Sequence, residues 1–131
     1  MRLYDYVDTR GINQIAKWTK KLPLRDRAKL NNKLQLLEQA GPDLLPGLLA
    51  GPNIQGQRHI YKLKIGSSGS GRALRPLLCR GPIDKEEELT LLIGAEERDG
   101  KLPKHVAKAA EDRRQEILAK PERRRPHDWV A

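Results

Sequence analysis

Two stretches of helical periodicity occupy the N-terminal part of the chain. Apolar residues at helical spacing predict a first helix over residues 11–21, and Pro23 interrupts that pattern. A second helix begins near Arg25 and carries one apolar stripe, formed by Leu30, Leu34 and Leu37. Gly41-Pro42 ends this helix, because glycine accepts the left-handed conformation of a helix end and proline cannot continue a helix.

Alternation of apolar and polar residues replaces the helical pattern in the middle of the chain and predicts β-strands. In the segment YKLKI, Tyr61, Leu63 and Ile65 point to one side of a strand, and Lys62 and Lys64 point to the other. The segment LTLLIG is apolar on both faces, which is typical of a central strand. We expect three strands, over residues 59–65, 72–80 and 88–94.

Turn-forming residues separate the predicted strands. GSSGSG, residues 66–71, predicts a loose hairpin turn and not a phosphate-binding loop, because neither a Lys-Ser/Thr pair nor a helix follows it. The acidic segment DKEEE, residues 84–88, predicts the second turn. Pro76 removes a ladder hydrogen bond, so we expect its strand to be irregular there. Residues 42–58 predict an ordered loop whose leucines pack inward.

The remaining pattern completes an α+β fold. Pro103 suits the first turn of a last helix, whose apolar face is formed by Val106, Ala110 and Ile117. The predicted architecture is an N-terminal helical hairpin packed on one face of a small antiparallel β-sheet, followed by a C-terminal helix. We expect residues 1–120 to form a single domain and residues 121–131 to form a mobile basic tail.

Composition narrows the classes of partner. The 131 residues carry a formal net charge of +9, which favours polyanions. A single cysteine, Cys79, excludes an internal disulfide and fits a reducing cytosol, so we expect a cytoplasmic protein. The longest apolar run is too short to span a bilayer, and we expect no membrane partner.

The positive charges are segregated along the chain. Residues 58–81 contain no Asp or Glu, whereas the turn that follows is acidic. Solvated surfaces usually mix charges of both signs, so this segregation favours a polyanion-binding sheet over a basic face that is merely hydrated. The basic residues of the segment, with His59 among them, are Arg58, Lys62, Lys64, Arg72, Arg75 and Arg80.

The candidate chemistry needs neither a metal nor a cofactor. The histidines and Cys79 are scattered without the spacing of metal ligands. RNA supplies its own nucleophile, the 2′-hydroxyl next to each phosphate. Crowded lysines depress one another's pKa, which makes a lysine suitable as a base, and arginine can bind phosphate with two hydrogen bonds. The same residue types also serve simple binding, so residue types alone leave cleavage and binding open.

Four segments of the chain, taken in their order along the sequence, resemble one known family. These segments are TRGINQIAKWTKKLPLRDRAKLNNKLQLLEQAG, LPGLLAGPNIQGQRHIYKLKI, RALRPLLCR and LTLLIGAEERDGKLPKHVAKAAEDR. Together they cover about residues 3–118 and resemble the RelE/ParE toxin superfamily, in particular its HigB-type, phage-derived branch. The resemblance implies a RelE-like fold and the toxin of a type II toxin–antitoxin system. Such a toxin is a metal-independent endoribonuclease that cuts mRNA on the ribosome and is neutralised by a cognate antitoxin protein.

The resemblance also implies roles for individual residues. Lys62 or Lys64 would act as the base and contact the phosphate, Arg75 and Arg98 would hold transition-state charge, and His105 is the candidate acid. Arg72 is the alternative to Arg75 in the alignment. The further RNA contacts that we expect, from the segregation of positive charge, are Arg58, His59, Arg72 and Arg80.

Two features keep a second function open. Glu96 and Glu97 stand where HigB-like relatives often carry lysines, and carboxylates near the site would weaken phosphate binding. The ParE branch of the same fold poisons DNA gyrase without a nuclease site, and a fold does not determine a function. The alternative is therefore a non-catalytic binder of gyrase, nucleic acid or antitoxin. The oligomeric state stays open.

Overall fold

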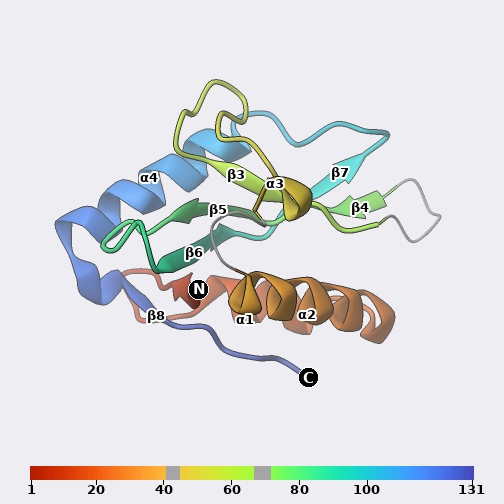
Figure 1. Ribbon diagram of the computed structural model, residues 1–131, viewed down its shortest axis with the longest axis horizontal. Coiled ribbons are helices and arrows are strands. Elements are labelled where there is room, and N and C mark those ends of the chain that lie inside the picture. Colours follow the sequence, from red (N-terminus) through yellow and green to blue (C-terminus); the bar gives the residue numbers. More distant parts are fainter. Residues whose placement is uncertain (41–44, 67–71) are drawn as a thin grey trace.

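A computed structural model describes residues 1–40, 45–66 and 72–131, with the backbone alone for residues 45 and 46 (Figure 1). The described residues form a six-stranded sheet with the strand order β2-β3-β5-β6-β1-β8, and a two-stranded sheet of β4 and β7. Among them, no helix is both long and apolar enough to cross a membrane. In chain order the elements are β1 (Arg2–Tyr6), α1 (Gln14–Lys20), α2 (Leu24–Gln39), α3 (Leu45–Leu48), β2 (Leu49–Ala50), β3 (Tyr61–Leu63), β4 (Arg72–Leu74), β5 (Leu77–Arg80), β6 (Glu88–Ile93), β7 (Glu96–Arg98), α4 (Val106–Ala119), the short 3-10 helix η2 (Pro121–Arg123) and β8 (Arg124–Pro126).

The predicted fold class is confirmed as a mixed α+β fold with a mostly antiparallel sheet. The helices α1, α2 and α4 lie where periodicity predicts them, and β6 occupies an inner position of the sheet. Pro76 lies in a break between β4 and β5, and the pairing register of β5 with β6 shifts between Leu77 and Leu78. The irregularity predicted at Pro76 is therefore present. Gly41-Pro42 and most of the predicted turn at 66–71 lie outside the described residues.

The chain begins with a strand that the sequence pattern does not predict. β1 lies inside the sheet, parallel to β6 and antiparallel to β8. Its buried Asp5 accepts hydrogen bonds from the Asn13 side chain and from two groups near the C-terminus, so an acidic residue can be buried there. The predicted order, with helices first, therefore differs from the observed one.

Helices cover both faces of the sheet, whereas the prediction placed them on one face. One core cluster joins leucines of α2, such as Leu34, to Leu78 and Leu91 of the sheet. A second cluster joins Ala107 and Ile117 of α4 to the opposite side of the same strands. The physical reason is that β6 is apolar on both faces, so each face must be covered. Figure 1 shows α1 and α2 on one side of the sheet and α4 on the other.

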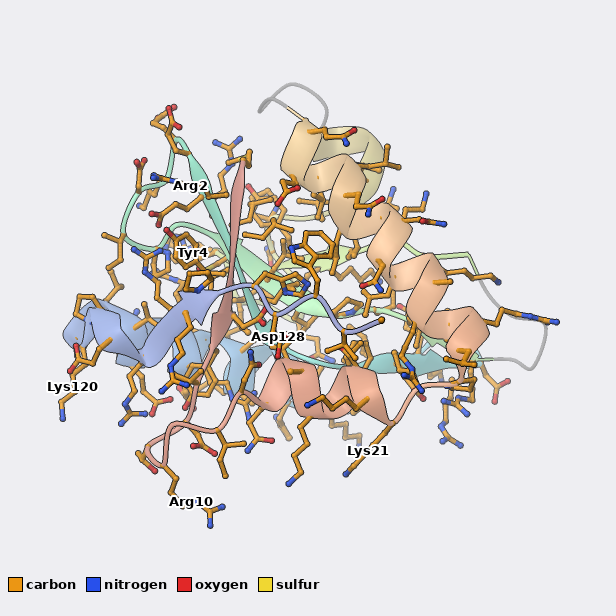
Figure 2. The ribbon with its side chains drawn as sticks, turned by 90° about the horizontal axis from the view of Figure 1, so that it is seen from below. Arg2, Tyr4, Arg10, Lys21, Lys120 and Asp128 are labelled. Carbon is orange, nitrogen blue, oxygen red and sulfur yellow. The ribbon has the colours of Figure 1, made fainter. Side chains whose placement is uncertain are left out.

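The C-terminal segment is an edge of the sheet, in contrast to the mobile tail predicted for residues 121–131. β8 pairs with β1, and His127 Nδ1 lies 2.7 Å from a carboxylate oxygen of the buried Asp5. The backbone N–H of Asp128 donates to the other oxygen of that carboxylate at 3.0 Å. Figure 2 shows the segment that carries Asp128 passing across β1, which carries Arg2 and Tyr4. The basic residues here are partly engaged, since Arg124 pairs with Glu88 at 2.7 Å.

Candidate anion-binding site

Two of the predicted catalytic cations share one carboxylate. Lys62 Nζ lies 2.7 Å from Glu97 Oε2, and Arg75 Nε lies 2.8 Å from Glu97 Oε1. The Glu97 side chain is 11% exposed, and those of Lys62 and Arg75 are 25% and 19% exposed. Both oxygens of the carboxylate are therefore occupied in a mostly dry environment, where an ion pair is screened little by salt. Glu97 stands where a phosphate would have to bind these two cations.

Arg75 is further engaged by the backbone. Its Nη1 donates to the carbonyl oxygens of Ile65 at 2.6 Å and Leu74 at 2.8 Å. These contacts tie the chain just after β3 to the end of β4, and the Glu97 contact adds β7. Arg75 thus holds together segments from three parts of the sequence, which is a structural role.

The cations of β4 and β7 lie on two different faces. In this antiparallel pair Arg72 is opposite Arg98, and Ala73 is opposite Glu97. Opposite residues share a face and neighbours along a strand alternate, so Arg72 and Arg98 point away from the face of Glu97. Arg72 forms a two-bond pair with Glu96, at 3.0 Å from Nε and 2.7 Å from Nη2. Glu96 and Glu97 therefore neutralise three of the predicted cations, on opposite sides.

The other residues of the predicted catalytic set lie elsewhere. Arg98 lines a pocket of about 400 Å³ together with Trp18 and Lys101. His105 is exposed just before α4, with a left-handed φ of 63°. Lys64 follows β3 and is exposed. The structure brings Lys62 and Arg75 together around Glu97, and it does not bring the five predicted catalytic residues to one site.

A different group of cations converges at the C-terminal end of β5. There the turn that leads from β5 to β6 meets helix α4 (Figure 1). This group surrounds a pocket of about 130 Å³, which we call the His59 pocket. Three of the predicted RNA contacts line it, and two further cations complete it. The lining residues are Pro52, Arg58, His59, Tyr61, Arg80, Lys85 and Arg114.

Four separate segments supply the side chains of the His59 pocket. Arg58 and His59 precede β3, Arg80 is the last residue of β5, and Arg114 lies on α4. Gly81 follows Arg80 with a φ of +72°, a conformation that favours glycine and lets the chain turn at once toward Lys85. The hydroxyl of Thr90 donates to the Gly81 carbonyl and fixes this turn against β6.

The charges of the His59 pocket are unbalanced. Arg114 is buried, and its Nε lies 3.0 Å from a carboxylate oxygen of Glu111. Within the described part of the chain, no carboxylate forms an ion pair with Arg58, Arg80 or Lys85. Convergent cations without partners create a positive potential that attracts anions.

His59 responds to this potential. Partial desolvation, followed by the positive charges of Arg114, Lys85 and Arg58, lowers the pKa of its imidazole below the usual value, and Glu111 opposes that shift. The ring is exposed, so a ligand in the pocket can reach it. The arrangement can bind an anion. The His59 ring would lie beside that anion, and the anion would change the charge of the ring.

Sequence reasoning missed Lys85 and Arg114. Lys85 is hidden in the acidic segment DKEEE, where its neighbours suggest no cationic site. Arg114 occupies the buried stripe of α4 together with Ala107, Ala110 and Ile117. A cation within an apolar stripe is a signal that could have identified it, because a buried charge requires partners.

Cys79 has no chemical role in this region. Its side chain is fully buried beneath the pocket's strands. Burial raises the pKa of its thiol to about 12, so the reactive thiolate does not form near neutral pH.

Comparison with family models, with curated proteins and with solved structures finds no match. The resemblance to the RelE/ParE superfamily therefore stays a prediction. The site has to be interpreted from its own geometry.

Proposed function

We propose that this protein binds RNA through phosphate contacts in the His59 pocket, and that it does so without cleaving RNA at Lys62 and Arg75. The observation that carries this proposal is the convergence of Arg58, Arg80 and Lys85 with no paired carboxylate among the described residues. Bringing like charges together costs free energy, and a bound anion offsets that cost. The net charge of +9 adds a long-range attraction to a polyanion.

The contacts of Glu97 do not favour catalysis by the lysine of β3. A general base needs a free lone pair, and Lys62 Nζ already donates a hydrogen bond to Glu97 at 2.7 Å. Arg75 cannot lose its proton under ordinary conditions. The endoribonuclease function thus depends on the resemblance, and the non-catalytic alternative agrees better with the ion pairs.

The resemblance supplies the biological context of this proposal. On that basis the RNA is mRNA on the ribosome, the partner is a cognate antitoxin protein, and the compartment is the cytoplasm. Binding in the ribosomal A site would inhibit translation without any cut.

Fluorescence anisotropy with a short single-stranded RNA tests the proposal. The Arg58→Ala/Arg80→Ala double variant should weaken binding and reduce the log–log salt slope by about 1.4, since each lost phosphate contact on a single strand contributes about 0.7. The matched control is Lys20→Ala/Arg25→Ala, which removes the same charge from exposed positions on α1 and α2. It should leave the slope nearly unchanged.

Two outcomes would overturn the proposal. Equal losses in the double variant and its control would mean that the His59 pocket is not the contact site. Mapping of RNA 5′ ends after expression gives the second readout, because the proposal expects intact transcripts. Specific cuts that disappear in Lys62→Ala would restore the endoribonuclease assignment.

A further inference from the structure

We propose that the His59 pocket selects a terminal phosphate, the phosphomonoester at the end of a nucleic acid chain or on a mononucleotide, over a phosphodiester inside a strand. This inference rests on the proposed function and specifies the ligand of the same site. Three features of the pocket and its surroundings support it: the size of the charge, the neutralised cations beside the pocket, and the acidic turn at its rim.

The charge of the His59 pocket exceeds what one phosphodiester can neutralise. Four cations line the pocket, and Glu111 pairs with one of them, Arg114; among the described residues this leaves Arg58, Arg80 and Lys85 without an ion pair. A phosphodiester carries a single negative charge, whereas a terminal phosphate carries about −1.5 to −2 at pH 7. The terminal group also offers three oxygens to donors that approach from four different segments.

The basic residues beside the pocket do not continue it as a groove. Proteins that bind internal stretches of single-stranded nucleic acid use a positively charged groove that follows the backbone. Here Glu97 occupies Lys62 and Arg75 and Glu96 occupies Arg72, while Lys64 is exposed. A strand that extended from the His59 pocket in this direction would meet paired charges.

The turn that carries Lys85 limits the opposite direction. Asp84, Glu86 and Glu87 surround Lys85 in sequence, and the two glutamates are exposed. The Asp84 carboxylate accepts hydrogen bonds from the backbone N–H groups of both glutamates, which holds this acidic turn together. A strand that left the pocket along this turn would run past acidic side chains and be repelled by them. One phosphate at the end of a chain avoids that repulsion.

Tyr61 provides the contact expected beyond the phosphate. Its ring is half-buried and lines the pocket together with the cations. Aromatic side chains next to phosphate sites stack on bases or sugars. The first nucleoside of the ligand can therefore rest on Tyr61 while its phosphate occupies the pocket.

Affinities for matched probes test the inference. The probes are one short RNA with a 5′-phosphate, the same RNA with a 3′-phosphate, the same RNA with hydroxyl ends, and AMP, all above the phosphate pKa of about 6. The phosphorylated RNAs should bind at least about tenfold more tightly than the hydroxyl RNA, because the terminal group adds a charge-assisted contact. Lys85→Ala should reduce this ratio, and the exposed control Lys20→Ala should not.

The outcomes distinguish a mononucleotide from the end of an RNA chain as the source of the phosphate. They also distinguish failure of the terminal-phosphate inference from failure of the proposed RNA binding. AMP that binds as tightly as the phosphorylated RNA identifies a mononucleotide ligand, and much weaker AMP identifies a chain end. Equal affinity for phosphorylated and hydroxyl RNA would overturn the terminal-phosphate inference. If Arg58→Ala/Arg80→Ala then still weakens both RNAs, the proposed function survives; if it weakens neither, both proposals fail.

Discussion

Lys62 places its ammonium group 2.7 Å from a carboxylate oxygen of Glu97. Arg75 lies 2.8 Å from the second oxygen of that carboxylate, so one glutamate pairs with two of the predicted catalytic cations. A formal net charge counts residues and says nothing about their pairing. Among the described residues, Arg58, Arg80 and Lys85 near His59 form no ion pair, whereas Lys62 and Arg75 of the predicted nuclease set are paired.

The first prediction concerns Glu97. Glu97→Gln leaves Lys62 and Arg75 without their carboxylate in a mostly buried place. The free energy of unfolding should fall by about 2 kcal/mol. This value lies between the ~0.5 kcal/mol lost with an exposed ion pair and the ~3–5 kcal/mol lost with a fully buried one. Urea denaturation measures this loss. RNA affinity should stay the same or rise, because two cations are released.

Glu96→Gln is the control for this prediction. It releases Arg72, whose side chain is already 40% exposed, and should cost less than about 1 kcal/mol. A clear loss of RNA affinity in Glu97→Gln would contradict the account, because it would mean that Glu97 positions a functional lysine.

The second prediction concerns the protonation of His59. Its pKa is lowered in the free protein, and a bound dianion favours the imidazolium and raises that pKa. Anion affinity should therefore increase as the pH falls, with proton uptake between the lower pKa of the free protein and the higher pKa of the complex. Sulfate is a suitable probe because its charge stays constant in this range, and an NMR titration of the His59 ring reports both pKa values.

The Arg58→Ala/Arg80→Ala variant is the reference for this titration. Sulfate should no longer shift the His59 pKa once these two guanidinium groups are absent. A His59 pKa that ignores sulfate in the unaltered protein would show that the pocket does not bind tetrahedral dianions.

The third prediction concerns the contact of Gly94 with Trp18. A Cβ at position 94 would overlap the Trp18 ring, so a side chain there requires the ring to move. Gly94→Ala should displace Trp18 and destabilise the protein by about 1–3 kcal/mol. Gly66→Ala is the matched control, since no atom of the described residues lies within 4 Å of its Cβ position. Equal melting temperatures for the two variants would show that Trp18 does not pack on Gly94.

The fourth prediction concerns the attachment of the C-terminal segment. His127→Ala removes one partner of the buried Asp5 and should cost about 1–3 kcal/mol. Asp128→Ala should cost less than about 0.5 kcal/mol, because Asp128 contacts Asp5 through its backbone N–H, which the substitution retains. Denaturation curves and the rate of proteolysis at the C-terminus compare the stabilities of the two variants. Similar stabilities would indicate that the segment is detached in solution, as the sequence pattern suggested.

The predictable parts of the fold are those encoded by local periodicity. The leucine stripe of α2 and the two-sided apolar pattern of β6 depend only on neighbours in sequence, and both elements lie where they were expected. β1 was missed because Asp5 interrupts its apolar pattern. The partner that allows Asp5 to be buried, His127, is 122 residues away in sequence. Such a contact has no local signature.

The candidate site shows the same limit. Charge segregation groups His59 with all six basic residues of 58–81, and the structure places three of the group, Arg58, His59 and Arg80, around one pocket. Lys85 and Arg114 join them only because the turn after β5 and α4 lie side by side. Glu97 is close to Lys62 in space but 35 residues away in sequence. A charge run shows where cations gather along the chain, and it cannot predict which of them are already paired.

The most direct measurement is an NMR titration of the protein with 5′-phosphorylated single-stranded RNA, following the side-chain signals of arginine and histidine. The account predicts that the Nε–Hε signals of Arg58 and Arg80 and the ring of His59 shift first and most strongly. Arg75, held by Glu97, should barely move. Shifts centred on Arg75 and its neighbour Lys62, with His59 unchanged, would contradict it.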